Sequence, residues 1–143
     1  MVCLAPRALE DSVRPRRPAD ASARPLNFTV RGHLRLRIND NWIEGDGVLF
    51  RGSYPVLEAS LIGDRVVVVY DWMAFDRAGP ARNLFCYDRS GRMLWRAADI
   101  GQGRVDAYTR VITEEPLSVG NFVGASCRIN EQTGQVVDTC FTK

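Results

Sequence analysis

The side chains best suited to molecular recognition gather in one irregular stretch, residues 72–82, which reads Trp-Met-Ala-Phe-Asp-Arg-Ala-Gly-Pro-Ala-Arg. Trp, Met and Arg are enriched where proteins contact proteins, and a long irregular segment inside a small domain is often functional. We therefore predict a protein-contact surface here. Its candidate binding residues are Trp72, Phe75, Asp76, Arg77 and Arg82. The competing interpretation is that Trp72 and Phe75 fold back over the end of a sheet.

Carboxylates in the same region suggest a different chemistry. Asp71, Asp76 and Arg82 would line a small-molecule site or an active site if their side chains met at the sheet end. Catalysis by paired carboxylates needs a defined separation between them, and nothing in the sequence fixes the separation of Asp71 and Asp76. A small-molecule-binding protein or an enzyme is therefore the alternative to a non-catalytic binding protein.

The other chemical signals point away from catalysis. His33 is the one histidine, and no serine or cysteine nucleophile motif surrounds it. The four cysteines include no Cys-x-x-Cys pair, so zinc and redox spacings are absent, and we expect reduced, buried thiols. Gly101-Gln102-Gly103 lacks the third glycine of a dinucleotide loop. We expect no catalytic residue, no metal site and no cofactor.

The charge distribution narrows the range of partners. The chain has 19 Lys and Arg against 17 Asp and Glu, but residues 1–25 hold five arginines against three acids, so residues 26–143 balance. Arg31, His33, Arg35 and Arg37 alternate along one strand face and form either a stripe for a phosphate or acidic partner or, as the balanced charge favours, a solvated face. A neutral domain lacks the basic footprint of a nucleic-acid-binding protein.

The sequence also indicates a location. No apolar run approaches the roughly 18 residues of a transmembrane helix, so we expect no membrane association. No apolar segment of a signal peptide follows the first arginines, which favours a cytoplasmic protein. Residues 1–25 are rich in Pro, Ala and Arg and are expected to be disordered. They are either a basic arm that touches an acidic partner or sequence upstream of the true start.

From Phe28 onward the hydrophobic period becomes two, which is typical of half-buried strands. One strand is expected at residues 33–38, followed by a turn at Asn39-Asp40-Asn41 and a second strand at 42–44. A further short strand is expected at 48–51. Residues 26–52 are therefore predicted to form an N-terminal hairpin.

Residues 56–97 predict four strands in two hairpins. Gly63-Asp64 joins the first two, over 56–62 and 65–71, in the pattern of a type II′ turn. The unbroken run Val66 to Val69 indicates a central strand buried on both faces. Asp88 is expected to cap the next turn with its carboxylate, and Gly91 to take the left-handed position.

The last third of the chain repeats this order of elements. Asn83 and Ala125 are 42 residues apart, and Gly91 and Gly134 are 43 residues apart. Periods of about 40 residues with four short strands each are typical of propeller blades. The second unit is expected to comprise strands over 108–113, 117–121, 125–130 and 135–140 within residues 106–142.

Residues 83–95, Asn-Leu-Phe-Cys-Tyr-Asp-Arg-Ser-Gly-Arg-Met-Leu-Trp, resemble a quinoprotein-type (PQQ-like) β-propeller repeat, in which a strand, an Asp, a turn Gly, apolar residues and a Trp follow one another. Residues 26–143 are similar to small uncharacterised bacterial proteins with such repeats. Asp138 stands where the second unit would repeat Trp95. Quinone-binding members of the larger class need a complete ring of blades, so the resemblance implies the fold and no cofactor.

The fold expected is all-β, with two four-stranded blade-like meanders and an N-terminal hairpin in a single domain over residues 26–143. Two units cannot close a propeller. The meanders therefore face each other as a sandwich or distorted barrel, or an edge strand pairs with a second chain in a homodimer. The function expected is a non-catalytic adaptor or immunity-type protein that captures one protein partner with residues 72–82.

Deleting residues 2–25 is expected to leave the melting temperature unchanged, because a Pro, Arg and Ala tract cannot bury enough apolar surface to offset its ordering entropy. Differential scanning calorimetry of the two proteins tests this. A drop of several degrees would show that the segment packs on the domain.

Overall fold

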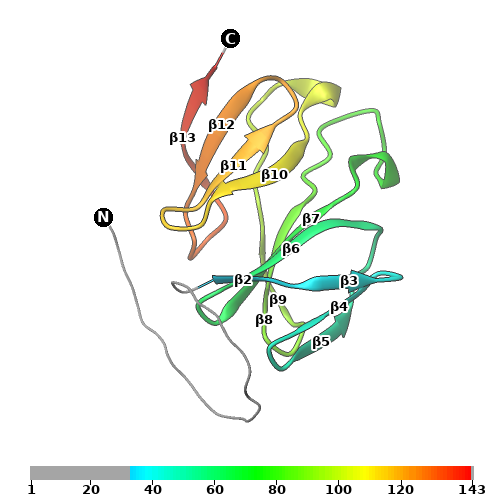
Figure 1. The fold of residues 1–143 in the computed structure, drawn as a ribbon. Coiled ribbons are helices and arrows are strands. Elements are labelled where there is room, and N and C mark those ends of the chain that lie inside the picture. The colour runs from blue at the N-terminus through cyan, green and yellow to red at the C-terminus, as the bar shows by residue number, and fades with distance from the viewer. Residues whose placement is uncertain (1–32, 143) are drawn as a thin grey trace.

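The computed structural model describes residues 33–142, with side chains from Leu36 onward. Apart from two short 3₁₀ turns, η2 (Trp72–Ala74) and η3 (Gly103–Val105), the regular elements of this part are β-strands. No helix within these residues is long and apolar enough to cross a bilayer. The protein is all-β, as predicted (Figure 1).

The strands form three antiparallel sheets. Within each sheet, neighbouring strands follow one another in the chain, except that residues 33–35 pair with a strand that starts at Val56. None of the sheets closes into a barrel within the described residues. The three-stranded sheet contains β3 (Arg37–Asn39), β4 (Trp42–Gly45) and β5 (Val48–Arg51). The five-stranded sheet has the order β2 (His33–Arg35), β6 (Val56–Ile62), β7 (Arg65–Tyr70), β8 (Leu84–Asp88), β9 (Met93–Arg96). The four-stranded sheet contains β10 (Tyr108–Thr113), β11 (Ser118–Asn121), β12 (Ala125–Ile129) and β13 (Val136–Phe141).

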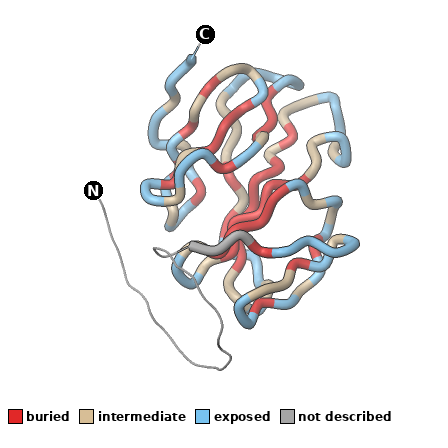
Figure 2. Tube along the Cα trace, viewed as in Figure 1, coloured by how far each residue is buried: buried red, intermediate tan, exposed pale blue. Residues whose placement is uncertain are grey.

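The sheets stack in three layers with the five-stranded sheet in the middle (Figure 1). Its central strand β7 divides its side chains between two cores. Val66 and Val68 pack toward the three-stranded sheet, and Val67 and Val69 pack toward the four-stranded sheet. The prediction of a strand buried on both faces is confirmed, and burial is concentrated around it (Figure 2). The two meanders therefore face each other across one of the cores.

The turns follow the predicted chemistry. Gly63 has a φ of +62° while Asp64 does not take a positive φ, as a type II′ turn requires. The Oδ1 atom of Asp88 accepts the backbone N–H groups of Ser90 and Arg92 at 2.9 and 3.0 Å. The hydrogen bond from the Ser90 hydroxyl is the main reason that the pKa of Asp88 falls to about 2. Gly91 is left-handed, as predicted.

The strand predicted over residues 33–38 is broken into two, whereas the hairpin predicted around Asn39-Asp40-Asn41 is present as β3 and β4. Residues 33–35 pair with β6 in the middle layer, and residues 37–39 pair with β4 in the outer layer. The chain changes sheets at Leu36, which is buried and donates its backbone N–H to Ala59. Leu36 holds both layers because its side chain belongs to the core between them.

The two units of the internal repeat share an irregularity in strand pairing at equivalent positions. In the middle layer Cys86 pairs with Trp95 but its neighbour Tyr87 pairs with Met93, so one residue of β9 is extra. In the last sheet Arg128 pairs with Asp138 but Ile129 pairs with Val136, so β13 has the same extra residue. Because β-bulges are defined local features, their equivalent positions support two copies of one unit.

A turn glycine packs against an aromatic ring at both junctions between layers. A Cβ atom on Gly91 would lie 2.7 Å from the ring of Phe50, and one on Gly134 would lie 2.5 Å from the ring of Trp95. Both glycines have φ values between +80° and +94°. Only glycine fits these positions, because any other residue adds a side chain where the ring already lies.

Gly134→Ala is expected to lower the free energy of unfolding by about 3 kcal/mol, combining left-handed strain with overpacking against Trp95. Gly63→Ala is the matched control, since Gly63 is also left-handed but a Cβ atom added to it would have no atom within 4 Å. We expect the control to lose only about 1 kcal/mol. Urea unfolding of both variants measures the difference. Equal losses of unfolding free energy would contradict the interpretation that packing against Trp95 requires glycine at position 134.

Candidate functional site

The predicted carboxylates at the start of segment 72–82 serve the local turns. Asp71 caps η2, and its Oδ1 atom accepts the N–H of Met73 at 2.9 Å. Asp76 Oδ1 accepts the N–H of Ala78, also at 2.9 Å. Each carboxylate therefore accepts a backbone N–H two residues ahead of it and has a structural role in its local turn.

Phe75 belongs mainly to the core. Its ring is half-buried and lies 4.3 Å from the ring of Tyr54, measured between centroids. The Arg96 guanidinium lies over the rings of Phe75 and Phe85, at 5.7 and 5.0 Å from their centroids. Burial is the main reason that the pKa of Arg96 is lowered. For this residue the fold-back interpretation describes the structure.

Arg82 is a bracing residue rather than a surface contact. It is left-handed, with a φ of +48°, which is uncommon for a residue other than glycine. Its Nε atom donates to the carbonyl of Ala97 at 3.0 Å, and its own carbonyl accepts the Nε of Arg96 at 2.8 Å. Arg82 therefore connects the end of segment 72–82 to the C-terminal end of β9.

Trp72 extends the site to a second sheet. Its half-buried ring lies 5.8 Å from that of Phe122, in the turn between β11 and β12. Phe122 itself is 60% exposed. Its backbone N–H donates to Ala107, just after η3, so three segments distant in sequence meet at this end of the sheets.

Arg77 and Arg104 face one open depression, which Val105 also lines. Both arginines are exposed, and Arg77 donates a long 3.6 Å contact to the sulfur of Met73. Met73 is 57% exposed and Val105 49% exposed. We call this set the loop-end surface; it comprises Met73, Arg77, Arg104, Val105 and Phe122.

Of the predicted site residues, Arg77 belongs to the loop-end surface, and Trp72 packs against its member Phe122. Asp76 lies beside it as a turn cap, whereas Phe75 and Arg82 point to internal partners. Arg104, Val105 and Phe122 were not among the predicted residues. The signal available for them was weak: one basic and one apolar residue in the connection before β10, and one aromatic residue in the turn after β11.

Buried polar side chains position the loop-end surface. Asp106 is 1% exposed, and its Oδ2 accepts the N–H groups of Ile100 and Gln102 at 2.7 and 3.1 Å. Its Oδ1 accepts the Asn121 side-chain amide at 2.9 Å, and its backbone carbonyl accepts the Ala81 N–H. One carboxylate thus fixes the connection before β10 and the turn after β11.

Asn83 makes the corresponding link at the other segment. Its side-chain amide donates to the carbonyls of Tyr70 and Tyr108 at 2.7 and 2.8 Å, and its Oδ1 accepts the Tyr108 N–H at 2.8 Å. Asn83 is fully buried, so these bonds replace water entirely. Neither Asn83 nor Asp106 was predicted from the sequence, because buried polar hubs carry no local pattern.

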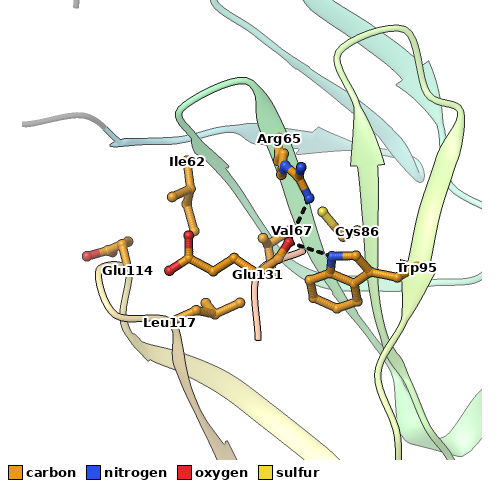
Figure 3. A pocket seen from close by; sticks show the side chains of 8 residues that line it. All are labelled: Ile62, Arg65, Val67, Cys86, Trp95, Glu114, Leu117 and Glu131. Carbon is orange, nitrogen blue, oxygen red and sulfur yellow. Dashed lines mark hydrogen bonds between the residues drawn. The ribbon is translucent and has the colours of Figure 1, made fainter. Parts of the chain in front are cut away.

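A second candidate site, between the middle and last sheets, is a small, partly open cavity (Figure 3). Its volume of about 20 Å³ holds one water molecule and no larger ligand. The Glu131 carbonyl accepts hydrogen bonds from Arg65 at 2.6 Å and from the Trp95 indole at 2.8 Å. Together with the packing of Gly134 on Trp95, these bonds join the two sheets.

The described cysteines are free thiols. Cys86 and Cys127 are buried as predicted, and burial raises the pKa of each thiol to about 11. Cys140 is exposed, which corrects the expectation of buried thiols for this residue. It pairs with Ser126 on the sheet face opposite Cys127, so its side chain lies outside the core. Among residues 36–142 no group of three metal-binding side chains occurs.

Of the arginine stripe, Arg31 and the side chains of His33 and Arg35 lie outside the described part of the chain. The remaining member, Arg37, is largely exposed and forms an ion pair of 3.5 Å with Glu44.

The chain matches one known family over almost all of the described residues. Residues 33–141 match the family described as Domain of unknown function (DUF7957), and the chain belongs to that family. No curated protein and no solved structure is significantly similar to the chain. The family boundaries include all three sheets and the whole loop-end surface.

In a Cys3→Ser background at pH 8, iodoacetamide is expected to label Cys140 and to leave Cys86 and Cys127 unmodified. A thiol with a pKa of about 11 is only about one part in a thousand thiolate at this pH, and both thiols are also shielded. Peptide mapping by mass spectrometry, with urea-unfolded protein as the control, tests this. Rapid labelling of either buried thiol in folded protein would contradict the described packing.

Proposed function

We propose that this protein is a non-catalytic protein-binding module, of the adaptor or immunity type, whose contact surface is the loop-end surface. The observation that carries the proposal is the combination of exposed Met73, Val105 and Phe122 with Arg77 and Arg104 on one end of the sheets. Exposed apolar side chains beside arginines are typical of protein interfaces. The buried hubs Asn83 and Asp106 support the proposal because they hold the surface in one shape before binding.

The alternative, a small-molecule-binding protein or enzyme, has one supporting observation. The depression between Arg77 and Arg104 has a volume of about 380 Å³, within the range of ligand pockets. However, it is open, and the side chains first considered for it, Asp71, Asp76 and Arg82, are engaged elsewhere. The protein-binding function therefore has the stronger support.

We also propose a cytoplasmic location. Free thiols at Cys86, Cys127 and Cys140 are the state expected in a reducing compartment.

The test compares partner capture by two variants that each remove exposed apolar side chains. Met73→Ser/Phe122→Ser is expected to abolish stoichiometric capture of one protein from a lysate of the source organism, with the melting temperature unchanged. Leu49→Ser is the matched control, because Leu49 is 63% exposed but lies on the three-stranded sheet. Capture is measured by quantitative mass spectrometry of affinity eluates.

Two outcomes would count against the proposal. Equal capture by wild type and by Met73→Ser/Phe122→Ser would show that the partner binds elsewhere. Stabilisation of the wild type by a metabolite in a thermal-shift panel, lost in Arg77→Ala, would support the small-molecule alternative instead.

A further inference from the structure

Arg77 and Arg104 are two guanidinium groups that the described chain leaves without a carboxylate. Neither lies within ion-pair distance of an acid in residues 36–142. Ion pairs between residues of the described part occur on the three-stranded sheet and at the turn between β8 and β9. The two arginines instead face the same depression, from η3 and from segment 72–82.

The acids nearest in sequence, which are Asp71, Asp76, Asp99 and Asp106, form no ion pair with either arginine. Asp76 and Asp71 each hold a backbone N–H of their own turn, and Asp106 is buried with both oxygens bonded. Because guanidinium groups bind carboxylates through two parallel hydrogen bonds, two such groups at one depression favour an anionic ligand.

The surroundings of the depression indicate what carries the anion. Val105 lines it, Met73 contacts Arg77, and Phe122 lies against Trp72 at the same end. A small inorganic anion would leave these exposed apolar side chains uncovered. A polypeptide can supply a carboxylate and an apolar side chain within a few residues of each other.

We infer that the loop-end surface recognises an acidic segment of a partner protein. Carboxylates of that segment pair with Arg77 and Arg104, and a neighbouring large apolar side chain covers Met73, Val105 and Phe122. The inference rests on the proposed function, which fixes the surface but not the chemistry of the partner. Charge complementarity is then the basis of selection among partners.

Random 12-residue peptides displayed on phage provide the probe, with the full chain as bait. We expect the enriched peptides to share Asp or Glu next to an aromatic or large aliphatic residue. A synthetic peptide from that set is then titrated by fluorescence anisotropy. Its affinity is expected to fall as NaCl rises from about 50 to 500 mM, because exposed ion pairs are screened.

Arg77→Glu/Arg104→Glu is expected to weaken the synthetic peptide at least about tenfold, since like charges then face each other. Arg128→Glu is the matched control, because Arg128 is also exposed but lies on β12, away from the loop end. We expect it to leave the affinity unchanged. Circular dichroism and the melting temperature verify that all variants fold.

Several results would overturn the inference. These are enrichment of no peptide, enrichment of peptides without acids, unchanged affinity in Arg77→Glu/Arg104→Glu, or tighter binding of the oligonucleotide dT12 than of any peptide. Non-acidic peptides that lose affinity in Met73→Ser/Phe122→Ser would refute the acidic partner and retain the proposed function. Peptides that bind Arg77→Glu/Arg104→Glu and Met73→Ser/Phe122→Ser as tightly as the wild type would refute both the acidic partner and the proposed function.

Discussion

The packing of a turn glycine against an aromatic ring is the contact on which the layered structure depends. It occurs twice, Gly91 on Phe50 and Gly134 on Trp95, and each time the glycine belongs to the sheet that follows the ring in the chain. At the second junction the Trp95 indole and Arg65 also donate hydrogen bonds to Glu131, three residues before the glycine. These contacts hold each new sheet against the previous one at the end of the strands where the glycine turn lies.

The loops at the other end of the strands form the surface that we propose for recognition. The turn that packs on Trp95 follows β12, after Ile129. The turn that carries Phe122 precedes β12, before Ala125. Likewise, the turn that packs on Phe50 follows β8, after Asp88, and segment 72–82 precedes the start of β8. The loop-end surface therefore lies at the end of the strands away from these glycine turns. There Asn83 joins β7 to β10, and Asp106 holds the turn after β11, through buried hydrogen bonds. Rigid polar anchoring beneath exposed loops reduces the entropy lost on binding.

Features set by neighbouring residues could be predicted from the sequence, and features set by distant contacts could not. The Asp88 cap, the Gly91 turn and the burial of β7 on both faces depend on local chemistry and hydrophobic pattern, and all are confirmed. The break at Leu36 depends on which strand lies beside each half, so alternation alone gave one strand where there are two.

The site shows the same division. Segment 72–82 was predicted as a surface from its composition, but Arg104 and Phe122 join it only through the packing of Trp72 and the hydrogen bond from Phe122 to Ala107. Phe75 and Arg82 have the residue types of an interface, yet the ring of Tyr54 and the carbonyl of Ala97 engage them internally. Residue type alone does not distinguish an arginine that braces the fold, such as Arg82, from one that is exposed, such as Arg77.

The two units differ on the outer face of the last sheet. Asp138 pairs with Arg128 at the position where Trp95 pairs with Cys86 in the middle layer. Arg128 and Asp138 are exposed, and on the same face Ser118 and Ser126 hydrogen bond through their hydroxyl groups at 2.9 Å. A further sheet would have to desolvate these polar groups and would find no ring for its turn glycine. Because the last sheet's outer face is unsuited to another layer of this kind, the loop end is the better candidate for partner binding.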